Sequence, residues 1–231
     1  MNRSGILGAK IERLKKELGN NATLVAVSKY HPASDIIAAY EAGHRDFGES
    51  RVQELKEKSE KLKDEGIDDI CWHFIGHLQT NKVNHLLRIQ NLRFIHSIDS
   101  MKLLMELYRK KEYFEGEDLG YFLQVKTSDE EEKYGFQGID SLREALNFIV
   151  EQPKGGPYLH GLMTMGKIRT DDFEGDARAA FKKLVCIKQE LLRDYSTFDL
   201  ALSMGMSQDY KMAVSEGSDF VRVGGAIFGQ D

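Results

Sequence analysis

Eight short apolar segments alternate with helix-like segments along the chain, and this alternation limits the fold more than any other feature. It predicts parallel βαβ units, because two parallel strands need a long crossover connection. Eight repeats favour a closed (β/α)8 TIM-type barrel, with an open doubly wound sheet as the alternative. The predicted strands are Thr23–Ser28, Asp46–Glu49, Ile70–Ile75, Arg93–Ile98, Gly120–Lys126, Tyr158–Met163, Asp199–Ser203 and Asp219–Val223.

An additional amphipathic helix, at residues 4–18, precedes the first predicted strand. Residues 224–231 are too few to form a full eighth helix after the last strand. We therefore expect the N-terminal helix to cover the seam that an eighth helix would cover. The other predicted helices are Ala33–Ala42, Val52–Glu65, Val83–Ile89, Ser100–Lys111, Ser141–Val150, Glu174–Arg193 and Gln208–Glu216.

The composition is that of a soluble globular protein, with 41% hydrophobic and 30% charged residues. There are three prolines and no Gly/Ser-rich linker, so we expect residues 1–231 to form a single domain. The net charge of −5 argues against a nucleic-acid binder. No apolar run approaches the roughly 18 residues of a membrane span, and the N-terminal helix lacks the features of a signal peptide. With two cysteines, Cys71 and Cys186, the chain is expected to be cytoplasmic.

The ends of the seventh and eighth predicted strands are rich in glycine and serine. Ser203-Met204-Gly205-Met206-Ser207 follows one, and Gly224-Gly225 follows the other. In TIM-type barrels these two neighbouring loops commonly bind phosphate, and glycine lets backbone N–H groups approach an anion closely. The two loops together favour a phosphate site over simple turns.

Lys29 directly follows the first predicted strand, so we expect its ammonium at the barrel mouth and partly buried. A neutral lysine amine is the nucleophile that forms a Schiff base with an aldehyde, although most lysines at strand ends are merely solvated. A lysine opposite a phosphate site suggests a ligand with an aldehyde and a phosphate. His73 and His77 mark no third ligand, so we expect no metal site and a packed His73.

Seven segments in one order resemble the pyridoxal-phosphate homeostasis protein family, which is related to the N-terminal barrel of alanine racemase. The resemblance covers nearly the whole chain. The segments are VAVSKYHPASDI (25–36), FGESRVQELKEK (47–58), WHFIGHLQTNK (72–82), KTSDEEEKYGF (126–136), LHGLMTMG (159–166), LSMGMSQDY (202–210) and VRVGGAIFG (221–229).

The resemblance implies a cofactor, pyridoxal 5′-phosphate, held as a Schiff base on Lys29. It implies that Ser203 and the backbone of Gly224 and Gly225 bind the phosphate, and that Arg222 faces the pyridine nitrogen. Ser50, Met163 and Met204 are then expected near the ring. The family has no established catalytic activity and is thought to buffer or deliver the cofactor in vitamin B6 homeostasis, which makes apo-enzymes that require the cofactor candidate partners. We expect a monomer.

Two positions depart from the family pattern. The family usually has asparagine at the position of Ser50 and threonine at the position of Gly225. Gly225 removes a hydroxyl from the expected phosphate site, which predicts weaker binding. Each hydrogen bond lost in this way is worth at most about 1.5–3 kcal/mol.

Two other functions fit parts of the sequence. The chain could be a pyridoxal-phosphate-dependent amino-acid racemase, which needs an acid/base group on the second face of the substrate. Tyr30 and His77 are the candidates for that group. The arginine expected at the pyridine nitrogen disfavours this function, because a strong electron sink needs a protonated nitrogen. The third hypothesis is a cofactor-free barrel enzyme that acts on a sugar phosphate through a lysine imine.

Overall fold

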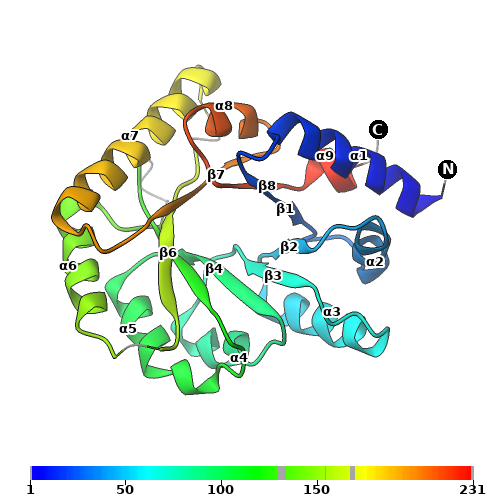
Figure 1. Ribbon diagram of the computed structural model, residues 1–231, viewed down its shortest axis with the longest axis horizontal. Helices are drawn as coiled ribbons and strands as arrows, with labels where there is room; N and C mark the ends of the chain where they lie inside the picture. The colour runs from blue at the N-terminus through cyan, green and yellow to red at the C-terminus, as the bar shows by residue number, and fades with distance from the viewer. Residues whose placement is uncertain (1, 129–133, 154, 167–169, 230–231) are drawn as a thin grey trace.

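A closed ring of eight parallel strands forms the centre of the computed structural model, which describes residues 2–128, 134–153, 155–166 and 170–229 (Figure 1). Each strand pairs with the next, and β8 returns to β1 with Val25 opposite Arg222. The barrel prediction is confirmed and the open sheet is wrong. The strands are β1 Thr23–Val27, β2 Asp46–Glu49, β3 Cys71–Phe74, β4 Leu92–Ile98, β5 Gly120–Gln124, β6 Tyr158–Met163, β7 Ala201–Met206 and β8 Phe220–Val223.

The strand β7 is the one whose predicted bounds matter most for the site. It ends at Met206, three positions beyond the predicted end at Ser203. Side-chain carboxylates accept backbone hydrogen bonds near both ends of the strand: Asp219 from Leu202 at 2.7 Å and Asp209 from Met206 at 2.5 Å. Ser203 therefore lies within the strand rather than at its end.

Helices surround the barrel on its outer side (Figure 1). Side chains cap the N-termini of three of them: Asn2, Ser100 and Asp172 each accept a hydrogen bond from a backbone N–H of the first turn. Among the described residues no helix is both long and apolar enough to cross a membrane. The helices are α1 Arg3–Leu18, α2 Ala33–Glu41, α3 Val52–Asp64, α4 Val83–Leu87, α5 Met101–Arg109, α6 Gly138–Val150, α7 Phe173–Asp194, α8 Tyr210–Ser215 and α9 Gly225–Phe228, with short 3₁₀ turns η1 Thr80–Lys82 and η2 Lys111–Tyr113.

The N-terminal helix α1 occupies the place expected for it. It contacts α2, α9 and β1 (Figure 1), and its apolar stripe is fully buried. Arg3 donates two hydrogen bonds to the carboxylate of Asp35 on α2, at 2.9 and 2.8 Å. Lys10 donates to the backbone oxygen of Gly229 just after α9, at 3.0 Å. Because α9 has four residues, α1 closes the outer layer next to β8 and β1.

Buried apolar side chains form two separate clusters. The larger one fills the layer between strands and helices, as the period-2 alternation of the strands requires. The smaller one lies inside the barrel and contains Val25, Phe122, Met163 and Phe220. The charged run at 128–133, which the sequence predicts as a loop, lies outside the described residues except for Ser128.

Candidate functional site at the barrel mouth

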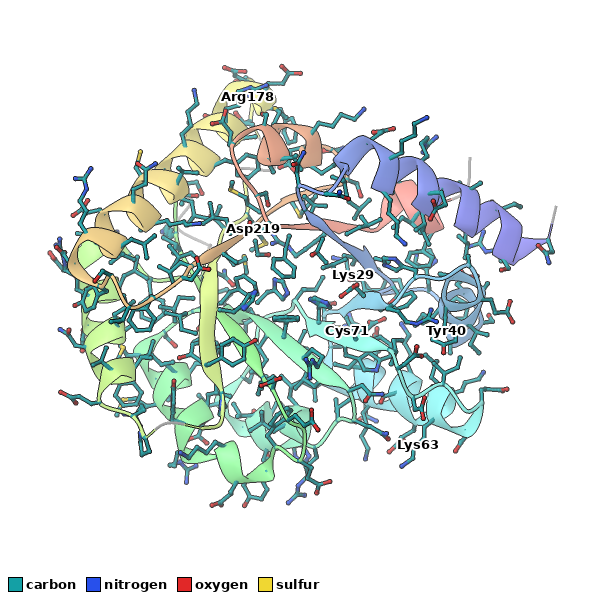
Figure 2. The ribbon with its side chains drawn as sticks, viewed as in Figure 1. Lys29, Tyr40, Lys63, Cys71, Arg178 and Asp219 are labelled. Carbon is teal, nitrogen blue, oxygen red and sulfur yellow. The ribbon has the colours of Figure 1, made fainter. Side chains whose placement is uncertain are left out.

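Lys29 lies at the carboxyl end of β1, toward the centre of the ring of strands, whereas Lys63 and Arg178 lie at the periphery (Figure 2). Its side chain is exposed, so the expected partial burial is wrong for the protein alone. The ammonium is 5.7 Å from the centre of the Tyr30 ring. Tyr30 has a φ of 69°, which non-glycine residues rarely adopt. Such strained backbone is common beside functional groups.

A buried polar cluster fixes the backbone that carries Lys29. The hydroxyl of Ser28 donates to Glu49 Oε1 at 2.7 Å. Lys58, which extends from α3, donates to the same oxygen at 2.6 Å and to the backbone oxygen of Ser28 at 3.0 Å. Ser28 and Glu49 have no exposed surface. These bonds hold the end of β1 to β2 and α3, so the attachment point of Lys29 has little freedom to move.

The ends of β7 and β8 approach each other beside Lys29. The N–H of Gly224 donates to the hydroxyl of Ser207 at 3.2 Å. A Cβ at Gly224 would lie 3.1 Å from the backbone oxygen of Val27, which is a tight contact. A Cβ at Gly225 would have Ser207 Oγ as its nearest neighbour, at 3.9 Å, so the space in front of Gly225 is open. The result is a small polar cradle of the kind that accepts an oxyanion.

Arg222 lies inside the barrel below this cradle, with 5% of its surface exposed. Its guanidinium donates to the hydroxyl of Ser203 and, at 3.0 Å, to the backbone oxygen of Thr164. Burial lowers the pKa of Arg222 to about 10, and the charge of Asp209 acts in the opposite direction. The guanidinium is therefore cationic at neutral pH.

Two of the predicted site residues, Ser203 and Met204, are adjacent in β7 and face opposite sides of the strand. Ser203 faces the barrel interior, where its hydroxyl contacts Arg222 and lies 2.8 Å from His96 Nδ1. Met204 is buried in the outer cluster between strands and helices, on the side of β7 away from Ser203. The residue that the site prediction missed is Ser207. It stands in the same glycine- and serine-rich segment, and the longer β7 brings it to the mouth.

The remaining predicted residues stay on the inner side or at the rim. Met163 is buried in the interior cluster. Ser50 is half-buried, and its backbone oxygen would lie 1.9 Å from a Cβ at Gly76, so only glycine fits at that position. Ser50 is thereby placed where β2 and β3 end, on the same side of the barrel as Lys29.

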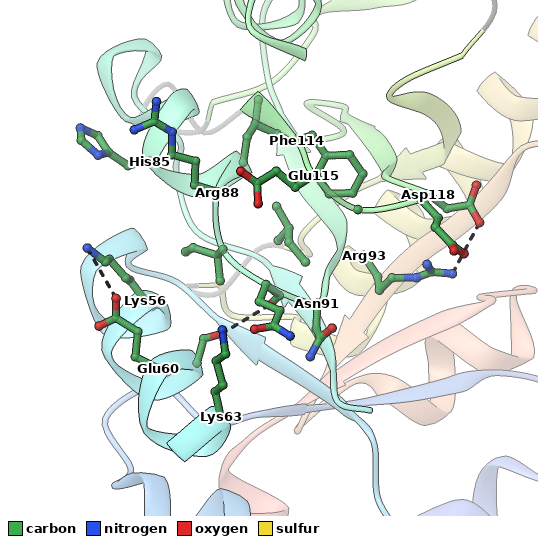
Figure 3. A pocket seen from close by; sticks show the side chains of 17 residues that line it. Lys56, Glu60, Lys63, His85, Arg88, Asn91, Arg93, Phe114, Glu115 and Asp118 are labelled. Carbon is green, nitrogen blue, oxygen red and sulfur yellow. Dashed lines mark hydrogen bonds and ion pairs between the residues drawn. The ribbon is translucent and has the colours of Figure 1, made fainter. Parts of the chain in front are cut away.

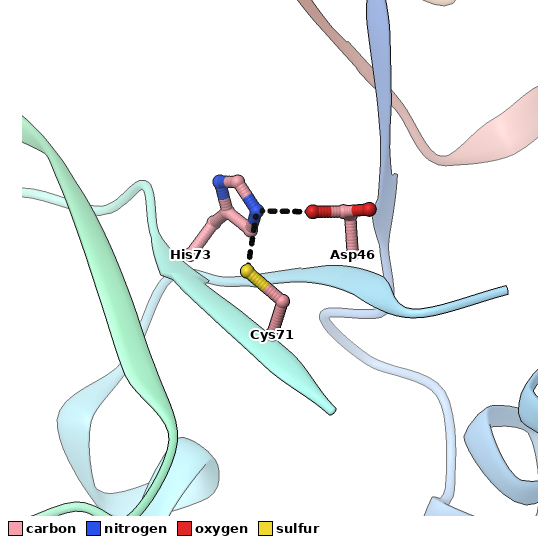
Figure 4. A group of neighbouring side chains, drawn as sticks. All are labelled: Asp46, Cys71 and His73. Atoms are coloured by element: carbon pink, nitrogen blue, oxygen red, sulfur yellow. Dashed lines mark hydrogen bonds and ion pairs between the residues drawn. The ribbon is translucent and has the colours of Figure 1, made fainter. Parts of the chain in front are cut away.

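The histidines of the predicted HxxxH pair have different surroundings. His73 is buried inside the barrel, as expected. His77 is partly exposed at the mouth, where its Nδ1 is 2.9 Å from Asp99 and its ring stacks on Tyr134 at 4.1 Å. At the opposite end of the barrel, Asp46, Cys71 and His73 bring three potential metal-ligand atoms within 4.8 Å of one another (Figure 4). The sequence pattern did not indicate this group.

A groove of about 770 Å³ lies away from the mouth, between α3, α4, the start of β4 and residues 114–118 (Figure 3). Two ion pairs line it: Lys56 with Glu60 at 3.6 Å, and Arg93 with Asp118 at 3.8 Å. It opens at the amino ends of the strands, whereas TIM-type barrels bind substrates at the carboxyl ends. We therefore assign the functional site to the mouth.

Known proteins match this architecture over almost its full length. Residues 5–231 match the family model for the alanine racemase N-terminal domain. The chain is 38% identical over 213 residues to the pyridoxal phosphate homeostasis protein of Schizosaccharomyces pombe (91% of this chain, 85% of that protein). It is 36% identical to the one of Aquifex aeolicus (100% and 99%). The structure of PipY from Synechococcus elongatus with PLP bound matches with a TM-score of 0.85 and 33% identity (96% and 100%). The chain therefore belongs to the pyridoxal phosphate homeostasis protein family, within the wider group that shares the alanine racemase N-terminal domain.

Proposed function

We propose that this protein binds pyridoxal 5′-phosphate at the barrel mouth through Lys29 and serves vitamin B6 homeostasis by holding the cofactor and passing it on. The observation that carries the proposal is the arrangement of one amine and one anion cradle on adjacent strands. Lys29 follows β1, and Gly224 follows β8, which pairs with β1. A small ligand with an aldehyde and a phosphate fits that pair. The relatives' name and the PLP-bound PipY structure support it.

Different residues of the mouth would bind different parts of the cofactor. Ser207 and the backbone of Gly224 and Gly225 would hold the phosphate. Ser203 belongs to a different part of the site, because its hydroxyl is engaged with Arg222 inside the barrel. The N–H of Gly224 donates to Ser207 Oγ in the protein alone, so phosphate binding would replace this bond with one to the phosphate.

Arg222 influences whether the protein stores the cofactor or uses it for catalysis. When bound, pyridoxal 5′-phosphate supplies an aldehyde that condenses with amines and a ring that withdraws electrons once its nitrogen is protonated. The buried cation of Arg222 opposes that protonation if it faces the ring nitrogen, as we propose. This arrangement favours storage and delivery over catalysis. Receivers of the cofactor would be cytoplasmic apo-enzymes that require it, and we propose that residues 1–231 act as one monomeric domain.

One observation keeps an amino-acid racemase as the second candidate. His77 and Asp99 form a close pair at the mouth, and a histidine oriented by a carboxylate is a usual acid/base group. Racemisation of a panel of amino acids by the loaded protein tests this function. We expect no turnover above the free-cofactor rate. Turnover that is lost on Lys29→Ala and on His77→Gln would replace storage with catalysis.

Trapping the bound cofactor tests the proposed site. Borohydride reduction of the loaded protein should fix the cofactor to one peptide, identified by mass spectrometry as the one containing Lys29. Lys29→Ala should lose both the adduct and the absorbance band of the lysine-bound cofactor. Lys126→Ala, which changes a half-buried lysine just beyond β5, should keep both. An adduct on Lys133 or Lys167, which lie outside the described residues, would contradict the assignment.

A further inference from the structure

A chain of hydrogen bonds crosses the barrel interior from the guanidinium of Arg222 to a carboxylate at the opposite end. Arg222 donates to Ser203 Oγ. Ser203 Oγ lies 2.8 Å from His96 Nδ1, and His96 Nε2 lies 2.9 Å from His73 Nδ1. His73 Nε2 lies 3.1 Å from Asp46 Oδ1. We call these five residues the interior chain. Strands β2, β3, β4, β7 and β8 contribute one residue each.

The two ends of the interior chain have opposite hydrogen-bonding character. A guanidinium has only donors, so Arg222 must donate to Ser203. A carboxylate has only acceptors, so Asp46 must accept from His73 (Figure 4). Burial alone would raise the pKa of Asp46, but the hydrogen bond from His73 lowers it, and the pKa lies below its ordinary value. Asp46 is therefore ionised at neutral pH.

Donation in one direction, from Arg222 through Ser203, His96 and His73 to Asp46, requires one ring proton on each histidine. Burial lowers the pKa of His96 well below its ordinary value, so His96 is neutral and carries one ring proton. This direction requires His73 to be neutral as well, and four protons then serve four hydrogen bonds: one each from Arg222, Ser203, His96 and His73. Both histidines then carry the proton on Nε2 and accept on Nδ1. The hydroxyl proton of Ser203 points to His96.

The opposite direction of donation leaves the hydroxyl proton of Ser203 without an acceptor in the interior chain and the carboxylate of Asp46 without a donor from His73. If His96 donated from Nδ1, Ser203 Oγ would receive two protons from its neighbours, and its own proton would have no acceptor among the described residues. His73 would then turn a bare Nε2 toward the carboxylate of Asp46. A buried polar group without a partner is costly, so one direction dominates.

We propose that Asp46, His73, His96 and Ser203 are positioning residues that hold the guanidinium of Arg222 in place at the ring site. Ser203 presents only lone pairs to Arg222, and the backbone oxygen of Thr164 holds the second guanidinium nitrogen at 3.0 Å. The guanidinium is thereby fixed from two sides inside the barrel. The role at the ring rests on the proposed function, whereas the direction of the chain is a property of the protein without cofactor.

The proton positions are measured directly in the cofactor-free protein. Nitrogen-15 NMR of histidine-labelled protein at neutral pH should show His73 and His96 as neutral rings protonated on Nε2. In Asp46→Asn the amide can donate as well as accept, so the proton on His73 should shift toward Nδ1. A wild-type protein with either ring protonated on Nδ1, or charged, would overturn the proposed direction. This result does not depend on cofactor binding.

The effect on the ring site is measured with two probes, pyridoxal 5′-phosphate and its analogue with carbon in place of the ring nitrogen. His96→Phe preserves the stack on Phe122, at 4.4 Å, and removes both hydrogen bonds. It should weaken binding of pyridoxal 5′-phosphate by about five- to tenfold, the value of one hydrogen bond, and leave binding of the analogue unchanged. Ser203→Ala should act in the same way.

The matched control is His160→Phe, because His160 packs on the same interior aromatic rings, Phe94, Phe122 and Phe220, outside the interior chain. It should leave the affinity for both probes within about twofold, well below the value of one hydrogen bond. Equal weakening of both probes by His96→Phe would show a merely structural role and overturn the proposal. So would stoichiometric Zn²⁺ binding that is lost on Cys71→Ser, because a metal on His73 Nε2 reverses the direction of the chain. Failure of the wild-type protein to bind pyridoxal 5′-phosphate would contradict the proposed function alone.

Discussion

The two faces of the barrel strands differ in chemistry. The outer face packs against helices through a large apolar cluster that includes the stripe of α1. The inner face combines a small apolar cluster with the polar interior chain and Arg222. Because neighbouring residues of a strand face opposite sides, the same eight strands serve both purposes. The comparison teaches that the outer layer provides stability, whereas the inner face carries polar groups that we propose support the ligand site at the mouth, so mutations should separate the two.

Buried polar groups of the outer layer and of the inner face also differ in how completely they are hydrogen-bonded. In the outer layer, Glu49 pairs with Lys58 through Oε1, while Oε2 has no hydrogen-bond partner among the described residues. In the interior chain every hydrogen bond has a proton and an acceptor. The outer pair therefore depends strongly on each partner, because removing Lys58 leaves a buried carboxylate without a cation.

Deletion of residues 1–19 should cause the largest loss of stability. It removes four fully buried side chains of the outer layer, Leu7, Ile11, Leu14 and Leu18. Each contributes about 1.5–3 kcal/mol, against a typical total stability of about 5–15 kcal/mol. We expect no cooperative thermal transition by circular dichroism. Lys16→Ala, on the exposed side of α1, is the control. A truncated protein that melts at the unchanged temperature would show that α1 does not close the outer layer.

Lys58→Met should give the next largest effect. Breaking a buried ion pair by removing one partner costs about 3–5 kcal/mol. Urea unfolding measures the loss, and Lys56→Met, which changes an exposed lysine of the same helix, should change stability by less than about 0.5 kcal/mol. The double variant Glu49→Gln with Lys58→Met should recover part of the loss. An unchanged free energy of unfolding in Lys58→Met would disprove the dependence of buried Glu49 on Lys58.

His44 makes a pH-dependent contribution to stability. Burial lowers its pKa to about 4, whereas an unfolded histidine titrates near about 6.5. The unfolded chain thus binds the proton first, so stability is complete above about pH 6.5 and falls as the pH drops toward 4. The difference in pKa corresponds to about 3 kcal/mol. In His44→Gln the free energy of unfolding should depend less on pH over this range. Parallel curves for both proteins would exclude His44 as the cause.

The sequence predicted most of the fold, because periodicity and turn residues carry that information. Strand β6 and the whole of α1 follow from local patterns. The strand β7 does not, since its backbone N–H groups at Leu202 and Met206 donate to the carboxylates of Asp219 and Asp209, which come later in the chain. The bond from Leu202 to Asp219 joins residues that are distant in the sequence and leaves no local signal.

The site was predictable only in part. The placement of Lys29 and Gly224 at neighbouring strand ends follows from the barrel rule. The orientation of Ser203 and Met204 required the register of β7, and the contribution of Ser207 followed from it. The interior chain was invisible to motif reading, because its members come from five strands and meet only when the barrel closes.

The smallest effect is expected from Gly225→Thr, which leaves the outer layer untouched and restores the residue usual in the family. The nearest atom to a Cβ at this position is Ser207 Oγ at 3.9 Å, so threonine fits without displacing a neighbour. Its hydroxyl adds a donor to the phosphate cradle, worth about 0.5–1.5 kcal/mol, or roughly two- to tenfold tighter binding. Equilibrium dialysis with pyridoxal 5′-phosphate measures the change, and thermal melting should be unaffected. Gly225→Val, which has the same shape without the hydroxyl, is the control. Because the hydroxyl acts on the phosphate alone, pyridoxal should bind Gly225→Thr and the unchanged protein equally, and a gain with pyridoxal would place the phosphate elsewhere.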